Sequence, residues 1–180
     1  MAFTSDLDQI TRAAAGDPAA VSSLVDRHSC GVLALATRML GDASEAEDVT
    51  QETFLRAWKA LPDWQPRAKF STWLYRVALN LCYDRLRKRR EVTMDHLPEL
   101  HDPQLTPSEL LDQSQRVRAI EAAISALPER QSAALTLCAL QGHSQAEAAE
   151  IMETSVQALE SLLARARRTL RESFMERSEA

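Results

Sequence analysis

A run of cationic side chains lies near the middle of this chain of 180 residues. Five of the six positions from 85 to 90 are basic: Arg85, Arg87, Lys88, Arg89 and Arg90. The repulsion among five neighbouring cations must be relieved by water or by an anionic partner, and phosphate is such a partner. The run therefore predicts a nucleic-acid contact. The alternative is a solvated helix end, whose cations suit the negative C-terminal pole of a helix.

Aromatic residues are concentrated just before this run, although they make up only 5% of the chain. They are Trp64, Phe70, Trp73, Tyr75 and Tyr83. Aromatic rings beside cations suit single-stranded DNA, because unstacked bases lie on the rings while phosphates meet Lys and Arg. Helical spacing places Trp73, Val77 and Leu81 on one stripe, which we expect to face the core. The opposite stripe holds the better DNA-binding candidates: Arg76, Asn80, Tyr83 and Arg87.

The segment 142–168 has the pattern of two helices joined by a tight turn at Glu153-Thr154-Ser155. A short helix, a turn and a longer amphipathic helix predict a helix-turn-helix. Glu153 stands where glycine is usual, because the turn tends to need a positive φ. The exposed face of the second helix presents side chains that can bind base edges or phosphates: Gln157, Glu160, Ser161, Arg165 and Arg168. The alternative is an ordinary helical hairpin with a solvated polar face.

A third set of residues suggests protein docking. In the predicted helix that ends near Leu61, polar side chains alternate with the large apolar Phe54, Leu55 and Trp58. Such a mixed face suits the helices of another protein. Its polar members are Asp48, Gln51, Glu52 and Arg56.

These residues must be positioned by helices, because apolar residues recur at intervals of three and four and alternating β-branched patterns are scarce. We expect one helix after Asp17-Pro18 that ends at Gly41, and a second that begins at Ser44, with Glu47 in a capping box. The other predicted helices cover about residues 71–90, 106–127, 128–142, 144–152 and 155–175.

The charge divides the chain into three parts. Net charges are +2 for residues 1–90, −6 for 91–113 and −1 for 114–180, which gives −5 in total. The middle part also holds Pro98, Pro103 and Pro107 and lacks a helical period before Leu110. We therefore predict an all-α fold of two small helical domains, 1–90 and 114–180, joined by an acidic flexible linker, with the helix-turn-helix in the second domain.

Composition excludes several classes of protein. No apolar stretch is long enough to span a bilayer, and the acidic start lacks the features of a signal peptide, so we expect a cytoplasmic protein without membrane insertion. The odd number of cysteines favours reduced thiols. The four histidines are scattered and no catalytic spacing or phosphate-binding loop is present, so we expect no enzyme, no cofactor and no metal. Weak metal binding by His96 and His101 is the alternative.

Three segments in order resemble a known family. They are LGDASEAEDVTQETFLRAWKAL, then FSTWLYRVALNLCYDRLRKRR, and, after the acidic linker, LPERQSAALTLCALQGHSQAEAAEIMETSVQALESLLARARRTLR. The chain resembles a bacterial extracytoplasmic-function (ECF) sigma factor of the sigma-70 family over about residues 5–173. The resemblance implies an alternative sigma factor that directs RNA polymerase to stress- or signal-responsive promoters, recognises both promoter elements and helps to melt the DNA. It also implies an anti-sigma factor that holds the two domains in an occluded arrangement.

The resemblance assigns roles to named residues. Docking on the β′ clamp helices of core RNA polymerase falls to Asp48, Gln51, Glu52, Leu55 and Arg56, and the C-terminal domain is expected to meet the β flap. Residues 62–70 and the helix that follows would melt and read the minus-ten element. There the minus-ten DNA would be bound by Trp73, Arg76, Asn80, Tyr83, Arg87, Lys88 and Arg89. The minus-thirty-five DNA would be bound by Gln157, Glu160, Ser161, Arg165 and Arg168.

One residue departs from the commoner pattern. Glu160 lies where many members have Arg or Lys, and a carboxylate can accept a hydrogen bond from cytosine N4, so we expect a shifted promoter preference rather than lost binding. The rival hypothesis is a sigma-like decoy that sequesters an anti-sigma factor without binding promoters. A decoy should have lost the cation run and the arginines of the second helix, and this chain has both.

Overall fold

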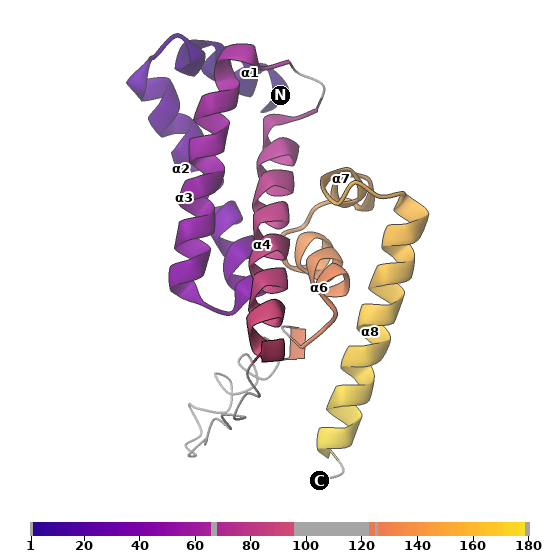
Figure 1. The fold of residues 1–180 in the computed structure, drawn as a ribbon. Helices are drawn as coiled ribbons and strands as arrows, with labels where there is room; N and C mark the ends of the chain where they lie inside the picture. Colours follow the sequence, from indigo (N-terminus) through magenta and orange to yellow (C-terminus); the bar gives the residue numbers. More distant parts are fainter. Residues whose placement is uncertain (1, 66–67, 96–122, 125, 179–180) are drawn as a thin grey trace, which may run out of the picture.

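The structure is a computed structural model that describes residues 2–65, 68–95, 123–124 and 126–178. The described residues form helices and contain no strand, which confirms the predicted all-α fold. Figure 1 shows the elements, which are α1 (Ala2–Ala14), α2 (Pro18–Leu40), α3 (Ala43–Ala60), η1 (Leu61–Asp63), α4 (Phe70–Asp95), α6 (Glu129–Leu135), η2 (Thr136–Leu140), α7 (Gln145–Ile151) and α8 (Val156–Ser178).

The first four α-helices form a bundle around α2. The caps of α2 follow the prediction: the Asp17 carboxylate accepts a hydrogen bond from the Ala19 N–H at 2.9 Å, and Gly41 ends the helix with a φ of 66°. On its inner face Leu24, Val32 and Leu35 are fully buried. These side chains form the centre of the N-terminal core.

Two details of the bundle differ from the predictions. Helix α3 begins before Ser44, and its N-cap is Asp42, whose carboxylate accepts from the Glu45 N–H at 2.8 Å. The predicted Ser44–Glu47 capping box is therefore wrong, because Asp42 already satisfies the first turn. Helix α1 was not predicted, since its sequence is largely polar and, from Asp6 to Ala14, Ile10 and Ala13 alone are buried.

Helix α4 buries a different stripe from the one predicted. Phe70, Leu74, Ala78 and Cys82 are buried, whereas Trp73, Val77 and Leu81 are only half-buried. The two stripes are adjacent on the helix, and the smaller Ala78 and Cys82 allow α4 to approach α2 and α3 closely. Helix α4 also continues to Asp95, beyond the expected end at Arg90. The rest of the predicted linker, residues 96–113, lies outside the described residues.

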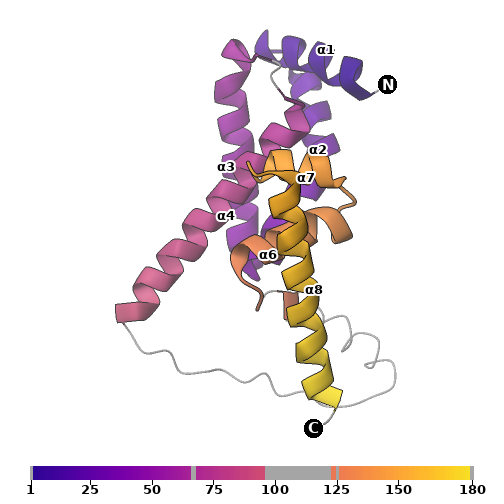
Figure 2. The same cartoon turned by 90° about the vertical axis from the view of Figure 1, so that its right-hand side faces the viewer.

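The C-terminal half contains the expected helix-turn-helix in α7 and α8 (Figure 2). Before it, α6 continues into the π-helix η2, where the Gln141 N–H donates to the Thr136 carbonyl at 3.0 Å. The predicted helix over 106–127 falls almost entirely outside the described residues. Among the described helices, none is long and apolar enough to cross a bilayer.

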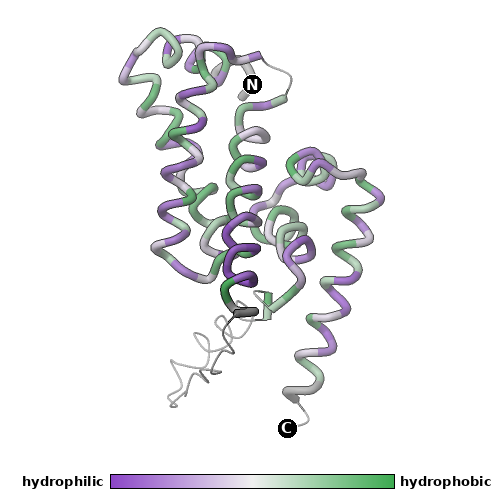
Figure 3. The backbone as a smooth tube through the Cα atoms, viewed as in Figure 1, coloured by the Kyte–Doolittle hydropathy of each residue, from purple (hydrophilic) through white to green (hydrophobic). Residues whose placement is uncertain are grey.

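The two halves pack against each other in this structure. Helix α7 contacts α4, and α6 contacts α2, so the buried side chains of both halves form one continuous cluster. Figure 3 shows that the later part of α4 is strongly hydrophilic, in contrast to its first turns. The arrangement therefore brings the helix-turn-helix next to the helix that carries the cation run.

Candidate nucleic-acid and protein interfaces

The five residues predicted to dock on polymerase share one groove between α3 and α4. The groove has a volume of about 420 Å³ and is lined by Asp48, Gln51, Glu52, Leu55, Arg56, Leu81, Asp84, Arg85 and Lys88. Asp48 lies 3.6 Å from Arg85, and Glu52 accepts a hydrogen bond from Arg56 at 2.8 Å, which lowers the pKa of Glu52. Leu55 is 52% exposed at the edge of the groove. The groove thus combines paired charges with an accessible leucine.

A second hollow lies on the other side of α3. It has a volume of about 360 Å³ and is lined by Val25, Ser29, Thr50, Gln51, Phe54, Leu55 and Trp58. Gln51 and Leu55 line both hollows and so form the ridge between them. The sequence predicted the apolar side chains of α3 here, but it gave no sign that Val25 and Ser29 of α2 complete the hollow. That proximity depends on the packing of α2 against α3.

The predicted minus-ten residues do not all face solvent. Asn80 is exposed, but Trp73 is half-buried and meets the ring of Trp64 edge-on, with the ring centroids 5.5 Å apart. Arg76 donates to the Glu150 carbonyl at 2.8 Å and lies 3.2 Å from the Glu153 carboxylate. Burial raises the pKa of the Tyr83 hydroxyl to about 12. Part of the predicted stripe is therefore covered by the C-terminal half.

Most of the cation run is neutralised by carboxylates of the chain itself. Arg87 donates to Asp84 at 2.9 Å, and Arg90 pairs with Glu129 of α6. Arg89 lies 3.0 Å from Glu45 and donates to the carbonyl of Leu40 at the end of α2, at 2.8 Å. Lys88 is exposed and lines the groove described above. The anions beside the cation run are carboxylates of α3, α4 and α6, whereas the sequence indicated water or an anionic partner.

The helix-turn-helix is built as the sequence predicts. The Ser144 hydroxyl accepts from the Glu147 N–H at 3.2 Å and the Glu147 carboxylate accepts from the Ser144 N–H at 3.2 Å, so the capping box is confirmed. Hydrogen bonds from Lys69 and Ser144 lower the pKa of Glu147 to about 2. In the turn, Glu153 has a φ of 49°, a conformation that costs about 1–2 kcal/mol in a residue other than glycine.

Helix α8 has one buried face and one exposed face. Leu159, Leu163 and Ala166 are buried against the other helices. The five predicted minus-thirty-five residues are all exposed: Gln157, Glu160, Ser161, Arg165 and Arg168. Ser161 and Arg165 also line a hollow of about 400 Å³ with Arg130 of α6. Sequence reasoning missed Arg130, because its position beside α8 depends on the packing of α6.

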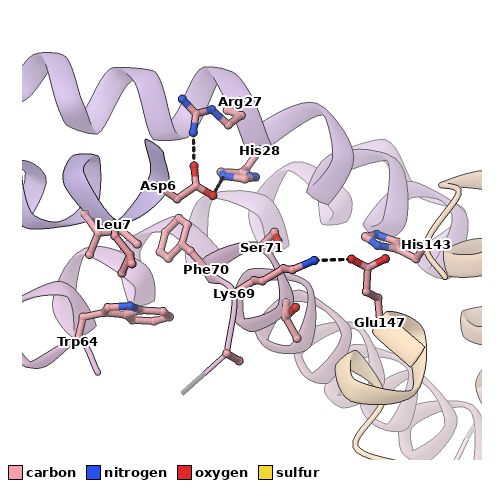
Figure 4. Close-up of a pocket in the computed structure, with 13 residues that line it drawn as sticks. Asp6, Leu7, Arg27, His28, Trp64, Lys69, Phe70, Ser71, His143 and Glu147 are labelled. Atoms are coloured by element: carbon pink, nitrogen blue, oxygen red, sulfur yellow. Dashed lines mark hydrogen bonds and ion pairs between the residues drawn. The ribbon is translucent and has the colours of Figure 1, made fainter. Parts of the chain in front are cut away.

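A cavity of about 250 Å³ lies where the two halves meet (Figure 4). Its walls include Trp64 and Phe70, whose ring centroids are 5.4 Å apart, and His28, whose pKa is lowered by burial. Asp6 pairs with Arg27 at one side, and Lys69 and Glu147 lie at the other. Within the described part of the chain, no group of three or more His, Cys, Asp or Glu side chains could hold a metal ion.

Comparison with known proteins places this geometry in a family. The sigma-70 region 2 model matches residues 24–92, and the sigma-70 region 4 model matches residues 117–170. The RNA polymerase sigma-H factor of Pseudomonas aeruginosa is 32% identical over 93% of this chain and 94% of its own length. The chain belongs to the sigma-70 family. The ECF RNA polymerase sigma factor SigE of Mycolicibacterium smegmatis is 34% identical over 92% of this chain, which places the sigma factor in the ECF group.

A solved structure agrees over almost the whole molecule. The structure of CnrH in complex with the cytosolic domain of CnrY matches with a TM-score of 0.70 and 29% identity, and covers 97% of this sigma factor and 99% of CnrH. The sigma factor spans only 66% of the length of the mycolicibacterial SigE, and 48% of the SigG protein of Mycobacterium tuberculosis. The solved CnrH structure therefore supports the helical sigma-factor fold of this chain. The two mycobacterial relatives are longer than this chain.

Proposed function

We propose that this sigma factor binds core RNA polymerase in the cytoplasm, directs it to stress- or signal-responsive promoters and helps to open them. The main support for this proposal is the groove between α3 and α4. The five docking candidates are separated by up to eight positions along α3, yet they line one surface together with Arg85 and Lys88 of α4. A groove with paired charges and the exposed Leu55 can take up a partner's helices through both polar and apolar contacts.

Promoter recognition is divided between the two halves. The exposed face of α8 would enter the major groove at the minus-thirty-five element, because the N-terminal part of a recognition helix reaches the base edges. Arg130 and Arg165, which line the same hollow, would hold phosphates beside it. Asn80 and Tyr83 of α4 would contact the melted minus-ten strand.

Two further partners belong to this proposal. CnrH is in complex with the cytosolic domain of CnrY, and we extend this to an anti-sigma factor for the present chain. We also expect α8 and the preceding helices to meet the β flap of polymerase. The sigma-like decoy is less well supported, because Arg165, Arg167, Arg168 and Arg171 of α8 are exposed and therefore accessible to DNA.

The first test is a charge reversal in the groove. Asp48→Lys with Glu52→Lys should weaken association with core enzyme at least tenfold, because it inverts the charge of one wall and opposes Arg85 and Arg56. Affinity is measured by fluorescence anisotropy with labelled sigma factor, and circular dichroism checks that the variant stays helical. The matched control is Asp8→Lys with Asp26→Lys, which changes the net charge equally on α1 and α2, outside the groove.

The second test is transcription from a promoter library by core enzyme and the purified sigma factor. Enrichment of promoters that share two spaced elements supports the proposal. A folded groove variant with unchanged core affinity, or a wild-type protein that binds core enzyme but starts no transcription, contradicts it. The second of these outcomes would favour the decoy.

A further inference from the structure

The helix-turn-helix lies on the part of α4 that is proposed to bind the minus-ten strand. Two ion pairs join the surfaces: Lys69 Nζ lies 2.7 Å from Glu147 Oε1, and Arg76 Nη1 lies 3.2 Å from Glu153 Oε1. Figure 4 shows the Glu147 carboxylate reaching from α7 to the Lys69 ammonium group. Arg76 also donates to the Glu150 carbonyl at 2.8 Å. Lys69 and Arg76, two cations on the proposed DNA-binding side, are thus paired with carboxylates of the C-terminal half.

Aromatic contacts fix the same junction. The rings of Tyr75 and His143 meet edge-on with centroids 4.7 Å apart. Tyr75 can lie there because position 31 is glycine, and a Cβ on Gly31 would overlap the Tyr75 hydroxyl. The side chain of Gln141, at the end of the π-helix, donates to the Gly31 carbonyl at 2.9 Å. The two halves are therefore complementary in shape as well as in charge at this junction.

The covered surface includes a predicted base-stacking residue. The Tyr83 hydroxyl is buried and has no hydrogen-bond partner among the described residues. The charged groups of Glu129 and Arg130, from the first turn of α6, lie close enough to affect its ionisation. The Tyr83 side chain is only partly exposed in this arrangement, and the ion pair of Arg90 with Glu129 holds the first turn of α6 near the same part of α4.

Glu153 connects this contact to the unusual turn. It is the only residue other than glycine with a positive φ among those that the structure describes. Glycine would relieve the backbone strain at this position, but it would supply no carboxylate to Arg76. Glu153 therefore has a strained backbone conformation, but its carboxylate forms an ion pair with Arg76 of the N-terminal half.

We propose that Glu147 and Glu153 form an autoinhibitory latch, in which their carboxylates take the place of DNA phosphates on Lys69 and Arg76 and keep the free sigma factor closed. The latch rests on the proposed function, since its target is the minus-ten surface. The side chains involved are between 29% and 59% exposed, so each ion pair is weak and the latch is reversible. Binding of the two domains to separate sites on polymerase would open it without an anti-sigma factor.

The test uses the full chain with Glu147→Gln and Glu153→Gly. Glutamine keeps the capping box at position 147, and glycine suits the positive φ at position 153, so both substitutions are compatible with the fold. The variant should have a larger radius of gyration in small-angle X-ray scattering. Its affinity for a short fluorescein-labelled oligo(dT) should rise roughly threefold to tenfold, as expected from the loss of two exposed ion pairs.

Controls separate the latch from a general charge effect. Glu47→Gln with Glu172→Gln removes two carboxylates outside the junction and should leave both the radius and the oligo(dT) affinity as in the wild type. Glu147→Gln with Glu153→Gln keeps the original turn and should reproduce the open variant, which guards against an effect of glycine on folding. Raising the salt concentration should also increase the wild-type radius, because exposed ion pairs are screened.

The outcomes decide between the alternatives. An unchanged radius in the variant overturns the latch, and so does a larger radius without tighter oligo(dT) binding, since the DNA-binding surface would then not be what the latch covers. Failure of wild type and variant alike to support transcription with core enzyme refutes the proposed function instead. The scattering measurement still reports whether the two carboxylates hold the chain closed.

Discussion

On α8, single residues divide sharply between the core and the solvent. Leu159 and Ala166 are fully buried, whereas Glu160 and Arg165, each next to one of them in sequence, are exposed. A helix with a period of 3.6 residues produces this division wherever one stripe is apolar. The exposed side chains can therefore be changed without loss of the fold, and their roles can be measured separately.

Arg165→Ala should lower transcription from all cognate promoters, whereas Glu160→Arg should change which base is preferred. Each good base contact is worth roughly 1–3 kcal/mol of discrimination, and we expect the exposed Glu160 to accept a hydrogen bond from cytosine N4. A promoter-library selection measures both effects. Arg171→Ala removes a cation further along the same helix and serves as the control. An unaltered ranking of minus-thirty-five sequences in Glu160→Arg would make Glu160 a solvated residue only.

The ion pair of Glu147 with Lys69 should make the stability of the folded chain depend on pH. Its pKa is lowered to about 2 in the folded chain, chiefly by Lys69, from an ordinary value of 4.5. A lowered pKa means that the stabilisation is complete above pH 4.5 and is lost as the pH falls towards about 2. The free energy of unfolding should therefore fall more steeply between pH 5 and pH 2 in the wild type than in Glu147→Gln. Urea titrations at several pH values measure this difference, with Glu150→Gln as control. Equal slopes in wild type and Glu147→Gln would show that the ion pair does not form.

Among the elements, α4 contributes side chains to three different surfaces. Its buried stripe holds the N-terminal core, Leu81 and Arg85 line the groove with α3, and Arg76 meets the helix-turn-helix. One helix of 26 residues therefore contributes to both the proposed polymerase-docking groove and the proposed DNA-opening surface. A change on one stripe of α4 should leave the other two surfaces intact.

Asn80→Ala should reduce open-complex formation while binding to core enzyme is unchanged. Asn80 is exposed on α4 and is not part of the groove, and one lost contact to a melted base costs about 1–3 kcal/mol. Permanganate reactivity of promoter thymines is the readout. Val92→Ala, exposed further along the same helix, is the control. Full reactivity in Asn80→Ala would assign strand opening to other residues.

The sequence predicted elements better than the contacts between them. Helix ends with local signals, such as Asp17-Pro18, Gly41 and the Ser144–Glu147 capping box, agree with the structure. The stripe of α4 was misassigned by one position, because Trp73 and Phe70 both fit an apolar face and only packing against α2 decides between them. Partners distant in sequence, such as Arg89 with the Leu40 carbonyl, left no pattern to detect.

For the whole molecule, the charge distribution decides how the sigma factor meets DNA. The net charge is −5, and much of the basic surface is paired with carboxylates. A negative chain is repelled by the phosphate backbone unless polymerase supplies further contacts. The closed arrangement adds to this effect, because α7 covers part of α4. That arrangement could not be predicted from local patterns, since it depends on packing between residues more than 70 positions apart.

The isolated sigma factor should therefore bind duplex promoter DNA weakly, with tight and specific binding only in the presence of core enzyme. Anisotropy with labelled duplex, with and without core enzyme at physiological salt, measures the difference. A duplex of scrambled sequence is the control. Specific binding by the free protein in the nanomolar range would contradict this expectation.

The internal pairing of the cation run has a thermodynamic consequence. Arg85, Arg87, Arg89 and Arg90 each lie against a carboxylate of the chain. When DNA takes over such a cation, the group that leaves is a tethered carboxylate rather than a mobile anion from the solution. Fewer small ions are then exchanged for each phosphate contact than the number of arginines suggests. The logarithm of promoter affinity should consequently fall less steeply with the logarithm of salt concentration than a count of these cations would give.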